Sequence, residues 1–249
     1  MRLLQLFFLF IIPSLIAVQQ SMIPMDNVQW FLKAQYGMAK FISNESKVPN
    51  DSEANAFDLP EATTSSLRLY LSAIFCKKHE FRLLYAPLEY EEIIKLDEDI
   101  TFNGATFSSN LNTTAGYRFN SYRLSYIYHL NMEKRYEYRL GLAGKIRDAS
   151  ISLKSDSNYS KYSNTGFVPL LHIGVKRRWK DKLCWDAELE GSWAPQGYAL
   201  DFRSSVDYQL FNGWFLGIGT GFLQGGADND KIKTFSTIFS SFLNFYKHF

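Results

Sequence analysis

The feature that most constrains the fold is a two-residue alternation of apolar and polar side chains, clearest in residues 231–249. One face of this stretch carries the apolar residues Phe235, Phe239, Leu243, Phe245 and Phe249. The other face carries the polar residues Thr234, Ser236, Ser240, Asn244 and His248. Alternation over this length is typical of a β-strand and not of a helix. Because about 9–11 tilted residues cross a bilayer as a strand, the stretch is long enough to span one.

Composition agrees with strands and argues against membrane helices. The chain is 46% hydrophobic and 16% aromatic, yet its mean hydropathy is −0.19. A helical membrane protein needs runs of about 20 apolar residues, and none occurs after residue 20. A transmembrane barrel needs no such run, since apolar residues that face lipid alternate with polar residues inside. The net charge of +2 is too small to indicate a nucleic-acid partner, and Cys76 and Cys184 make no disulfide framework.

The N-terminal residues predict export. Arg2 is followed by an apolar core that ends at Ile16, and Ala17 is a small residue suited to cleavage. We therefore expect a signal peptide over residues 1–17 and a single barrel over residues 18–249. A transmembrane anchor is the alternative, disfavoured by Pro13 and by the shortness of the apolar core.

The alternation predicts ten strands, an even number as expected for single-chain bacterial barrels. They cover residues 27–41, 67–75, 79–88, 111–130, 136–154, 166–180, 183–195, 198–210, 214–224 and 231–249. Eight or twelve strands are the alternatives, depending on whether residues 27–41 form a strand and whether residues 89–107 join the wall. Residues 89–110 predict an acidic connection with a small hairpin at 100–107.

Two further expectations concern the shape of the barrel. Short connections alternate with longer ones, which predicts short periplasmic turns, long outer loops and both termini on the periplasmic side. The apolar parity changes near Asn120 and again near Arg147, which predicts paired bulges in these two strands. The expected fold is therefore an all-β, antiparallel, up-and-down transmembrane barrel. A soluble barrel of the lipocalin type is the alternative, disfavoured because it would bury the apolar face and expose the charged one.

Several sequence blocks carry a resemblance. The chain ends on Phe249, with Phe245 and Leu243 at alternate positions before it, and this resembles the closing strand of bacterial outer-membrane β-barrels; Lys247 departs from the usual apolar residue. The blocks at residues 117–126, 145–149, 166–171 and 225–230 resemble recurring segments of a family of such barrels to which no activity is attached. The resemblance covers residues 67–249. It implies a fold and a place in the outer membrane of a Gram-negative bacterium, and no activity.

Inward positions of the predicted strands hold a cluster of charges. Its members are Lys176, Arg178, Asp186, Glu188, Glu190, Asp201, Arg203 and Asp207. A three-residue turn would place Arg178 opposite Asp186 and Lys176 opposite Glu188. Because buried charges need partners, the cluster predicts a salt-bridged lumen. A polar pore or a ligand site lined by the same groups is the alternative.

Candidate catalytic residues are few. His172 faces inward near Glu190, and a histidine beside a carboxylate is a candidate general base; a hydrogen-bonded structural histidine is the plainer interpretation. The chain has no Gly-x-Ser-x-Gly motif and no Cys/His spacing typical of a metal site. The acidic residues 225–230 favour an ordinary turn over a calcium loop. We expect no metal and no cofactor.

These observations predict a non-enzymatic outer-membrane barrel, either a narrow pore or a structural barrel with a charged interior. The alternatives are an outer-membrane enzyme that acts on lipid or lipopolysaccharide, and a surface-binding or adhesion barrel that acts through its outer loops. The expected partners are outer-membrane lipids, lipopolysaccharide and the barrel-assembly machinery, the last through the C-terminal strand. Nucleic acid is not an expected partner.

Overall fold

The computed structural model describes residues 28–51, 54–109, 111–131, 135–180 and 182–249. The signal peptide expected at residues 1–17 lies outside this range. The described residues form strands and no helix, so none of them belongs to a helix that could cross a membrane. The strands are β1 (Val28–Lys47), β2 (Phe57–Asp58), β3 (Thr63–Phe75), β4 (His79–Ala86), β5 (Glu89–Lys95), β6 (Ile100–Phe102), β7 (Ala105–Phe107), β8 (Asn112–Leu130), β9 (Tyr136–Lys154), β10 (Tyr159–Lys180), β11 (Leu183–Ala194), β12 (Gly197–Gln209), β13 (Trp214–Asn229) and β14 (Ile232–His248).

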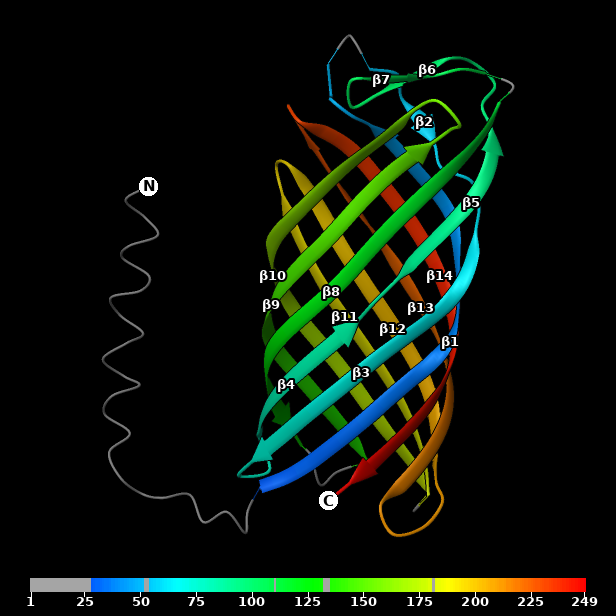
Figure 1. The fold of residues 1–249 in the computed structure, drawn as a ribbon. Helices are drawn as coiled ribbons and strands as arrows, with labels where there is room; N and C mark the ends of the chain where they lie inside the picture. The colour runs from blue at the N-terminus through cyan, green and yellow to red at the C-terminus, as the bar shows by residue number, and fades with distance from the viewer. Residues whose placement is uncertain (1–27, 52–53, 110, 132–134, 181) are drawn as a thin grey trace, which may run out of the picture.

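The long strands close into a ten-stranded antiparallel barrel (Figure 1). Each pairs with its neighbours in chain order, and β14 closes the sheet by pairing with β1 from Phe31↔His248 to Lys47↔Lys233. The predicted strand count is confirmed. Residues 28–47 do form a wall strand, and β5 adds no eleventh strand because it continues the wall position of β4 along β8.

The two ends of the barrel differ. One end carries the start of β1, the end of β14 and the short connections 76–78 and 210–213 (Figure 1). We call it the terminal end. The other, the loop end, carries the long connections after β1 and β4. Four strands extend further toward the loop end than predicted: β1, β3, β10 and β13 include residues 42–47, 63–66, 159–165 and 225–229. These polar segments were predicted as loops, but their backbones continue the sheet pairing.

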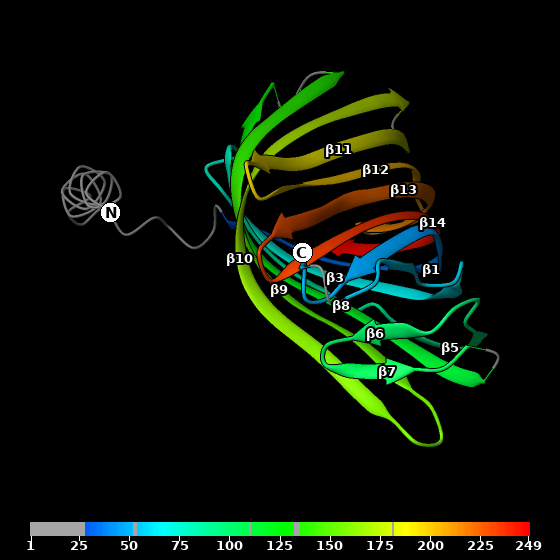
Figure 2. The same ribbon diagram turned by 90° about the horizontal axis from the view of Figure 1, so that it is seen from above.

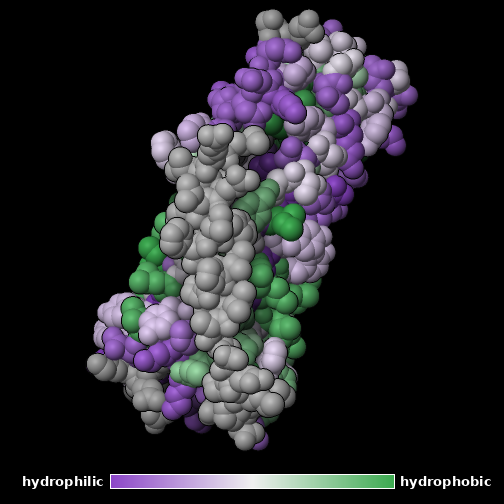
Figure 3. All heavy atoms as spheres, turned by 90° about the vertical axis from the view of Figure 1, so that its left-hand side faces the viewer, coloured by the Kyte–Doolittle hydropathy of each residue, from purple (hydrophilic) through white to green (hydrophobic). Residues whose placement is uncertain are grey.

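The outer face carries a band of apolar side chains. On β9 the outward residues Tyr136, Tyr138, Leu140, Leu142 and Ile146 are exposed, while Glu137, Arg139 and Lys145 between them are buried inside. Figure 3 shows hydrophobic side chains around the middle of the molecule and hydrophilic ones toward the loop end. The soluble, lipocalin-type alternative is therefore wrong, because that fold would bury its apolar face.

The changes of apolar parity near Asn120 and Arg147 are not bulges. The β8–β9 register runs without a shift from Thr114↔Lys154 to Leu130↔Tyr138. Odd-numbered residues of both strands face inward throughout; near Asn120 and Arg147 the interior changes from polar to apolar. Toward the loop end Tyr117 and Ile151 are buried inside, while Arg118 and Asp148 pair on the outer face at 3.1 Å. A register shift does occur in β1, between Phe41 and Ser43.

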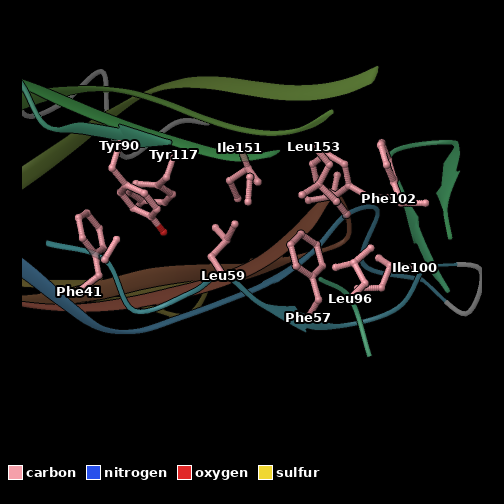
Figure 4. Close-up of a cluster of buried hydrophobic side chains, with 14 of the residues drawn as sticks. Phe41, Phe57, Leu59, Tyr90, Leu96, Ile100, Phe102, Tyr117, Ile151 and Leu153 are labelled. Carbon is pink, nitrogen blue, oxygen red and sulfur yellow. The ribbon is translucent and has the colours of Figure 1, made fainter. Parts of the chain in front are cut away.

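The apolar interior at the loop end is a packed core (Figure 4). Phe41, Tyr117 and Leu153 from the wall meet Phe57 and Phe102 from the connections that fold over the mouth. The Phe57 and Phe102 rings lie edge to face, 5.5 Å apart. The predicted hairpin at 100–107 is confirmed as β6–β7, and Figure 2 shows it over the side of β5 and β8, away from β11 and β12.

Candidate functional site

Ion pairs that cross the lumen fill the middle of the barrel. Arg123 on β8 reaches Asp201 on β12 at 2.6 Å and also pairs with Glu190 on β11. Arg68 on β3 reaches the same Asp201 carboxylate at 3.1 Å. These strands stand on opposite walls, so the side chains bridge the barrel instead of lining an open passage. Such pairs are stable inside a barrel because each carboxylate is matched by a guanidinium at hydrogen-bond distance.

We call six of these residues the septum: Arg68, Arg123, His172, Glu190, Asp201 and Arg203. All are buried or nearly so. Arg203 extends the group to β1, since its Nη1 donates to Gln35 Oε1 at 3.3 Å and its guanidinium lies 5.1 Å from the Phe242 ring centre. The septum therefore joins both walls at mid-height.

A second network lies between the septum and the terminal end. Arg82 pairs with Glu80 at 2.8 Å and with Glu188 at 2.9 Å. Arg139 pairs with Asp186 at 2.8 Å and shares Glu188. The two ring nitrogens of His129 each lie 2.8 Å from a carboxylate oxygen, of Glu137 and of Glu80. This network again joins β4, β8 and β9 to β11.

The predicted lumen charges all face the interior, but two predicted pairs are wrong. Lys176 lies opposite Asp186, not Glu188, and Arg178 lies opposite Cys184, not Asp186. The register shifts by one residue between Arg178 and Lys180, which accounts for one of the two residues by which the expected partners are displaced. Arg178 instead reaches across β10–β9 to Glu137 at 2.8 Å. Asp207 accepts hydrogen bonds from Asn244 Nδ2 at 2.8 Å and Ser205 Oγ at 3.1 Å.

His172 lies opposite Glu190, and its Nδ1 is 3.1 Å from Glu190 Oε1. The side chain is 1% exposed, and its Nε2 is buried without a hydrogen-bond partner in the described part of the chain. A general base must reach the proton it removes. In this position His172 has a carboxylate neighbour, and it lines neither of the two cavities described next.

Two cavities lie on either side of the septum. The terminal-end cavity has a volume of about 400 Å³ and is lined by both signs of charge, among them Lys33, Glu137, Lys176 and Asp207. The loop-end cavity has a volume of about 370 Å³ and is lined by Tyr117, Lys145, Arg147, Tyr162 and Trp193, among others. The cavities share no described lining residue, and no septum residue lines either of them.

Other candidate chemistry finds little support. No group of three or more His, Cys, Asp or Glu side chains in the described segments is placed to hold a metal ion. Cys76 is exposed in a turn and Cys184 is buried in the lumen, both as free thiols. Within residues 225–230, 225–229 belong to β13, and Asn229 Oδ1 accepts the backbone N–H groups of Lys231 and Ile232 at 3.0 and 3.2 Å. The segment is thus a strand end followed by a tight turn.

The predicted charge cluster leaves out the arginines that hold its carboxylates. The arginines that pair with the predicted carboxylates are Arg68, Arg82, Arg123 and Arg139. Each stands at an inward position of its strand, so alternation alone marks it as interior. What alternation does not show is which strands face one another across the lumen, because that depends on strand number and stagger. Lys145 also stands at an inward position, opposite Arg123, and was not part of the predicted cluster.

No protein-family model and no curated protein matches the chain. Solved structures do. The crystal structure of the outer membrane protease OmpT from Escherichia coli superposes with a TM-score of 0.64 and 8% identity, covering 93% of this chain and 99% of that one. The translocator domain of the autotransporter NalP from Neisseria meningitidis gives 0.49 and 12%, covering 95% and 92%. Ail from Yersinia pestis gives 0.45 and 9%, covering 87% and 98%. At such identity the likeness concerns the fold: the chain has the fold of an outer-membrane β-barrel.

Proposed function

We propose that this protein is an outer-membrane barrel with a closed lumen, a structural barrel that does not conduct. The observation that carries the proposal is the septum, whose ion pairs join opposite walls between two separate cavities. A continuous polar pore would need a lining of charges directed at water. Here each septum carboxylate is held by an arginine from another strand, so opening a passage would break pairs that are costly to break.

The placement in the membrane follows from the apolar band. Closed barrels are the one way for strands to cross hydrocarbon, because they leave no unpaired edge across the apolar layer. The outward apolar residues of β9, Tyr136 to Ile146, match the length of about 9–11 residues that cross a bilayer. In the proposed orientation the loop end faces outward and both described ends of the chain face the periplasm. Outer-membrane lipids and lipopolysaccharide surround the band, and the N-terminal segment directs export.

The test is the single-channel conductance of the refolded mature chain in a planar bilayer. We expect no discrete current steps from the native sequence. A quadruple variant with Arg68, Arg123, Glu190 and Asp201 all changed to Ala removes two cations and two anions from the septum, and should open a small conductance. The matched control is Arg118→Ala with Asp148→Ala, an ion pair of 3.1 Å on the outer face, which should stay silent. Stable steps from the native barrel would overturn the proposal.

The enzyme alternative receives less support from the geometry. The OmpT structure is that of a protease by its description, but a likeness in fold does not carry an activity. Neither His nor carboxylate occurs among the described residues that line the loop-end cavity, and His172 is sealed in the septum. A surface-binding barrel would act through the connections that pack over the mouth. A separate binding assay tests this alternative, because the conductance experiment does not address it.

A further inference from the structure

The wall of the barrel is not paired along its whole height. β9 and β10 pair continuously from Tyr159↔Lys154 to Arg177↔Tyr136. β10 and β11 pair from Lys180↔Leu183 only as far as Leu171↔Gly191. Beyond that point, residues 159–170 of β10 do not pair with β11, and residues 192–194 of β11 do not pair with β10. The β9–β10 turn and the β11–β12 turn lie at opposite sides of the loop end (Figure 1). We call this unpaired stretch the seam.

The sequence of β10 suits a free edge at this point. Pro169 lies within the seam and still faces Gly144 of β9 in the register. Proline has no N–H to donate, so within sheets it is confined to edges, strand starts and bulges. A second break, between β3 and β5, is different, because Thr64 Oγ1 donates to the Glu89 carbonyl at 2.9 Å and Leu59 and Tyr90 pack beneath it.

The loop-end cavity lies directly behind the seam. It is lined by inward residues such as Val168 and Ser192, and also by Phe167, Pro169 and Trp193 on the rim. Phe167 is 70% exposed and Trp193 81% exposed, so the lining continues from the interior to the outer face. Leu171 and Ile173 continue the apolar outer face below the seam, and Thr165 is the next outward residue above Phe167. The seam therefore meets the loop-side boundary of the apolar band.

Two cations in this cavity form no ion pair with a described residue. Lys145 is buried and makes neither an ion pair nor a hydrogen bond with a described residue; its Nζ lies 4.6 Å from the Phe119 ring centre. Arg147 donates from Nη2 to the amide oxygen of Asn164 at 2.6 Å, and its buried Nε has no partner. No described lining residue is acidic. The septum arginines Arg68 and Arg123, by contrast, are each paired with a carboxylate.

We propose that the seam is a lateral entrance and that the cavity binds an anionic amphiphile with an acyl chain. The acidic head would lie against Lys145 and Arg147, with Asn164 beside it. The chain would run along Tyr162 and Val168 and leave over Phe167 and Trp193 toward the hydrocarbon. Burying a cation without a counter-charge is unfavourable, and an anionic head removes that cost. An apolar pocket with a few convergent polar groups is the usual form of a small-molecule site, and about 370 Å³ lies within the usual range.

The proposal assumes the membrane-spanning barrel inferred above, but it does not depend on whether the lumen conducts. Its chemistry has two sources: a free fatty acid, or the phosphorylated and acylated core of lipopolysaccharide in the surrounding leaflet. Both offer an acidic head beside acyl chain. The experiment therefore uses one probe of each kind.

The test measures binding to the refolded full chain in a nonionic detergent. The probes are oleate, its uncharged counterpart oleyl alcohol, and purified lipid A, each in competition with a fluorescent fatty acid. We expect oleate or lipid A to bind. If oleate is the ligand, oleyl alcohol should bind about tenfold more weakly or worse, because it lacks the charge-assisted hydrogen bonds, which contribute at least this difference in affinity. The double variant Lys145→Gln with Arg147→Gln should lose about tenfold or more in affinity for the charged probe and none for oleyl alcohol.

Two controls separate the site from the fold. Lys161→Gln removes an exposed cation of β10 that lies outside the cavity and should leave all affinities unchanged. Ser192→Trp fills the cavity beside the seam without changing charge and should weaken every ligand. If the double variant loses affinity for only one of oleate and lipid A, that probe identifies the source of the ligand. The proposal is overturned if no probe binds, or if the double variant binds the charged probe as well as the native chain does. Conductance from the native barrel would contradict the closed lumen, but it would not affect the conclusion on ligand binding.

Discussion

At the scale of single residues, the interior contains two kinds of buried cation. Arg123 is held by Glu190, Asp201 and the Ser121 hydroxyl, which lies 3.1 Å from its Nε. Lys145, which lies directly opposite Arg123 on the neighbouring strand β9, has an aromatic ring beside it and no ion pair with a described residue. The same change, a charged side chain replaced by methionine, should therefore have opposite effects at the two positions.

Arg123→Met should destabilise the barrel by about 3–5 kcal/mol, because it leaves two carboxylates buried with fewer partners. The measurement is the free energy of unfolding in urea, with the protein refolded in lipid vesicles. Arg118→Met is the matched control, since the Arg118–Asp148 pair is on the outer face and a third exposed; it should cost less than about 1 kcal/mol. Equal losses at the two positions would contradict the septum as described.

Lys145→Met should stabilise the barrel in the absence of ligand, by on the order of 1 kcal/mol, because it removes a buried charge that has no counter-charge. The same urea experiment measures it, in a nonionic medium free of fatty acid. A loss of stability would mean that Lys145 has an anionic partner in the folded barrel. If Lys145→Met stabilises the barrel and the double variant loses ligand affinity, Lys145 lowers the stability of the free protein and contributes to ligand binding.

At the scale of elements, β10 is the unusual strand. Its first half has one partner, β9, whereas its second half has two. In an antiparallel strand successive N–H groups point to opposite sides, so an unpaired edge exposes alternate amides. We expect alternate protection from hydrogen exchange along Tyr159–Leu170 and continuous protection along Leu171–Lys180.

Residue-resolved hydrogen exchange of the refolded barrel checks this expectation. The control is the upper part of β9, residues 144–154, which pairs with both β8 and β10 at the same height and should be protected without alternation. Uniform protection of residues 159–170 would show that β11 or another segment pairs with this edge, and the lateral entrance would then be closed.

How far the sequence predicts these elements depends on the solvent each face meets. Where the outer face is apolar and the inner face polar, alternation placed the strands of residues 136–154 and 183–194 within a residue of their observed ends. Above the band both faces change character, so residues 159–165 read as a loop and the change near Asn120 read as a bulge. His172 was predicted near Glu190 and does pair with it, although the predicted register was displaced by two residues. The bridges to Arg68 and Arg123 were not foreseeable, since they depend on how the closed barrel brings distant strands face to face.

At the scale of the whole molecule, closure joins the first described strand to the last. The backbone N–H of Phe249 donates to the Trp30 carbonyl at 3.0 Å, while its side chain is 71% exposed. A truncation of that ring keeps the backbone bond. We propose that the exposed ring serves recognition by the barrel-assembly machinery and contributes little to the folded state.

Phe249→Ala should therefore change the free energy of unfolding by less than about 0.5 kcal/mol, yet reduce the amount of folded protein in the outer membrane. The measurement is the heat-modifiable band in membrane fractions of expressing cells. Phe239→Ala removes an equally apolar, exposed ring from the middle of β14 and should not change that amount. An equal reduction by both variants would contradict recognition through the end of the strand.

The inversion of the interior near Asn120 and Arg147 also determines how deep the barrel sits. Below it the outward residues of β9 are apolar up to Ile146; directly above it come Asp148 on β9 and Arg118 on β8. A barrel displaced inward by one outward position would carry these charges toward hydrocarbon, at a cost that grows with depth. A barrel displaced outward would expose apolar side chains to water. The sequence thus holds the barrel at one height, and it holds the lateral entrance at the height of the lipid headgroups.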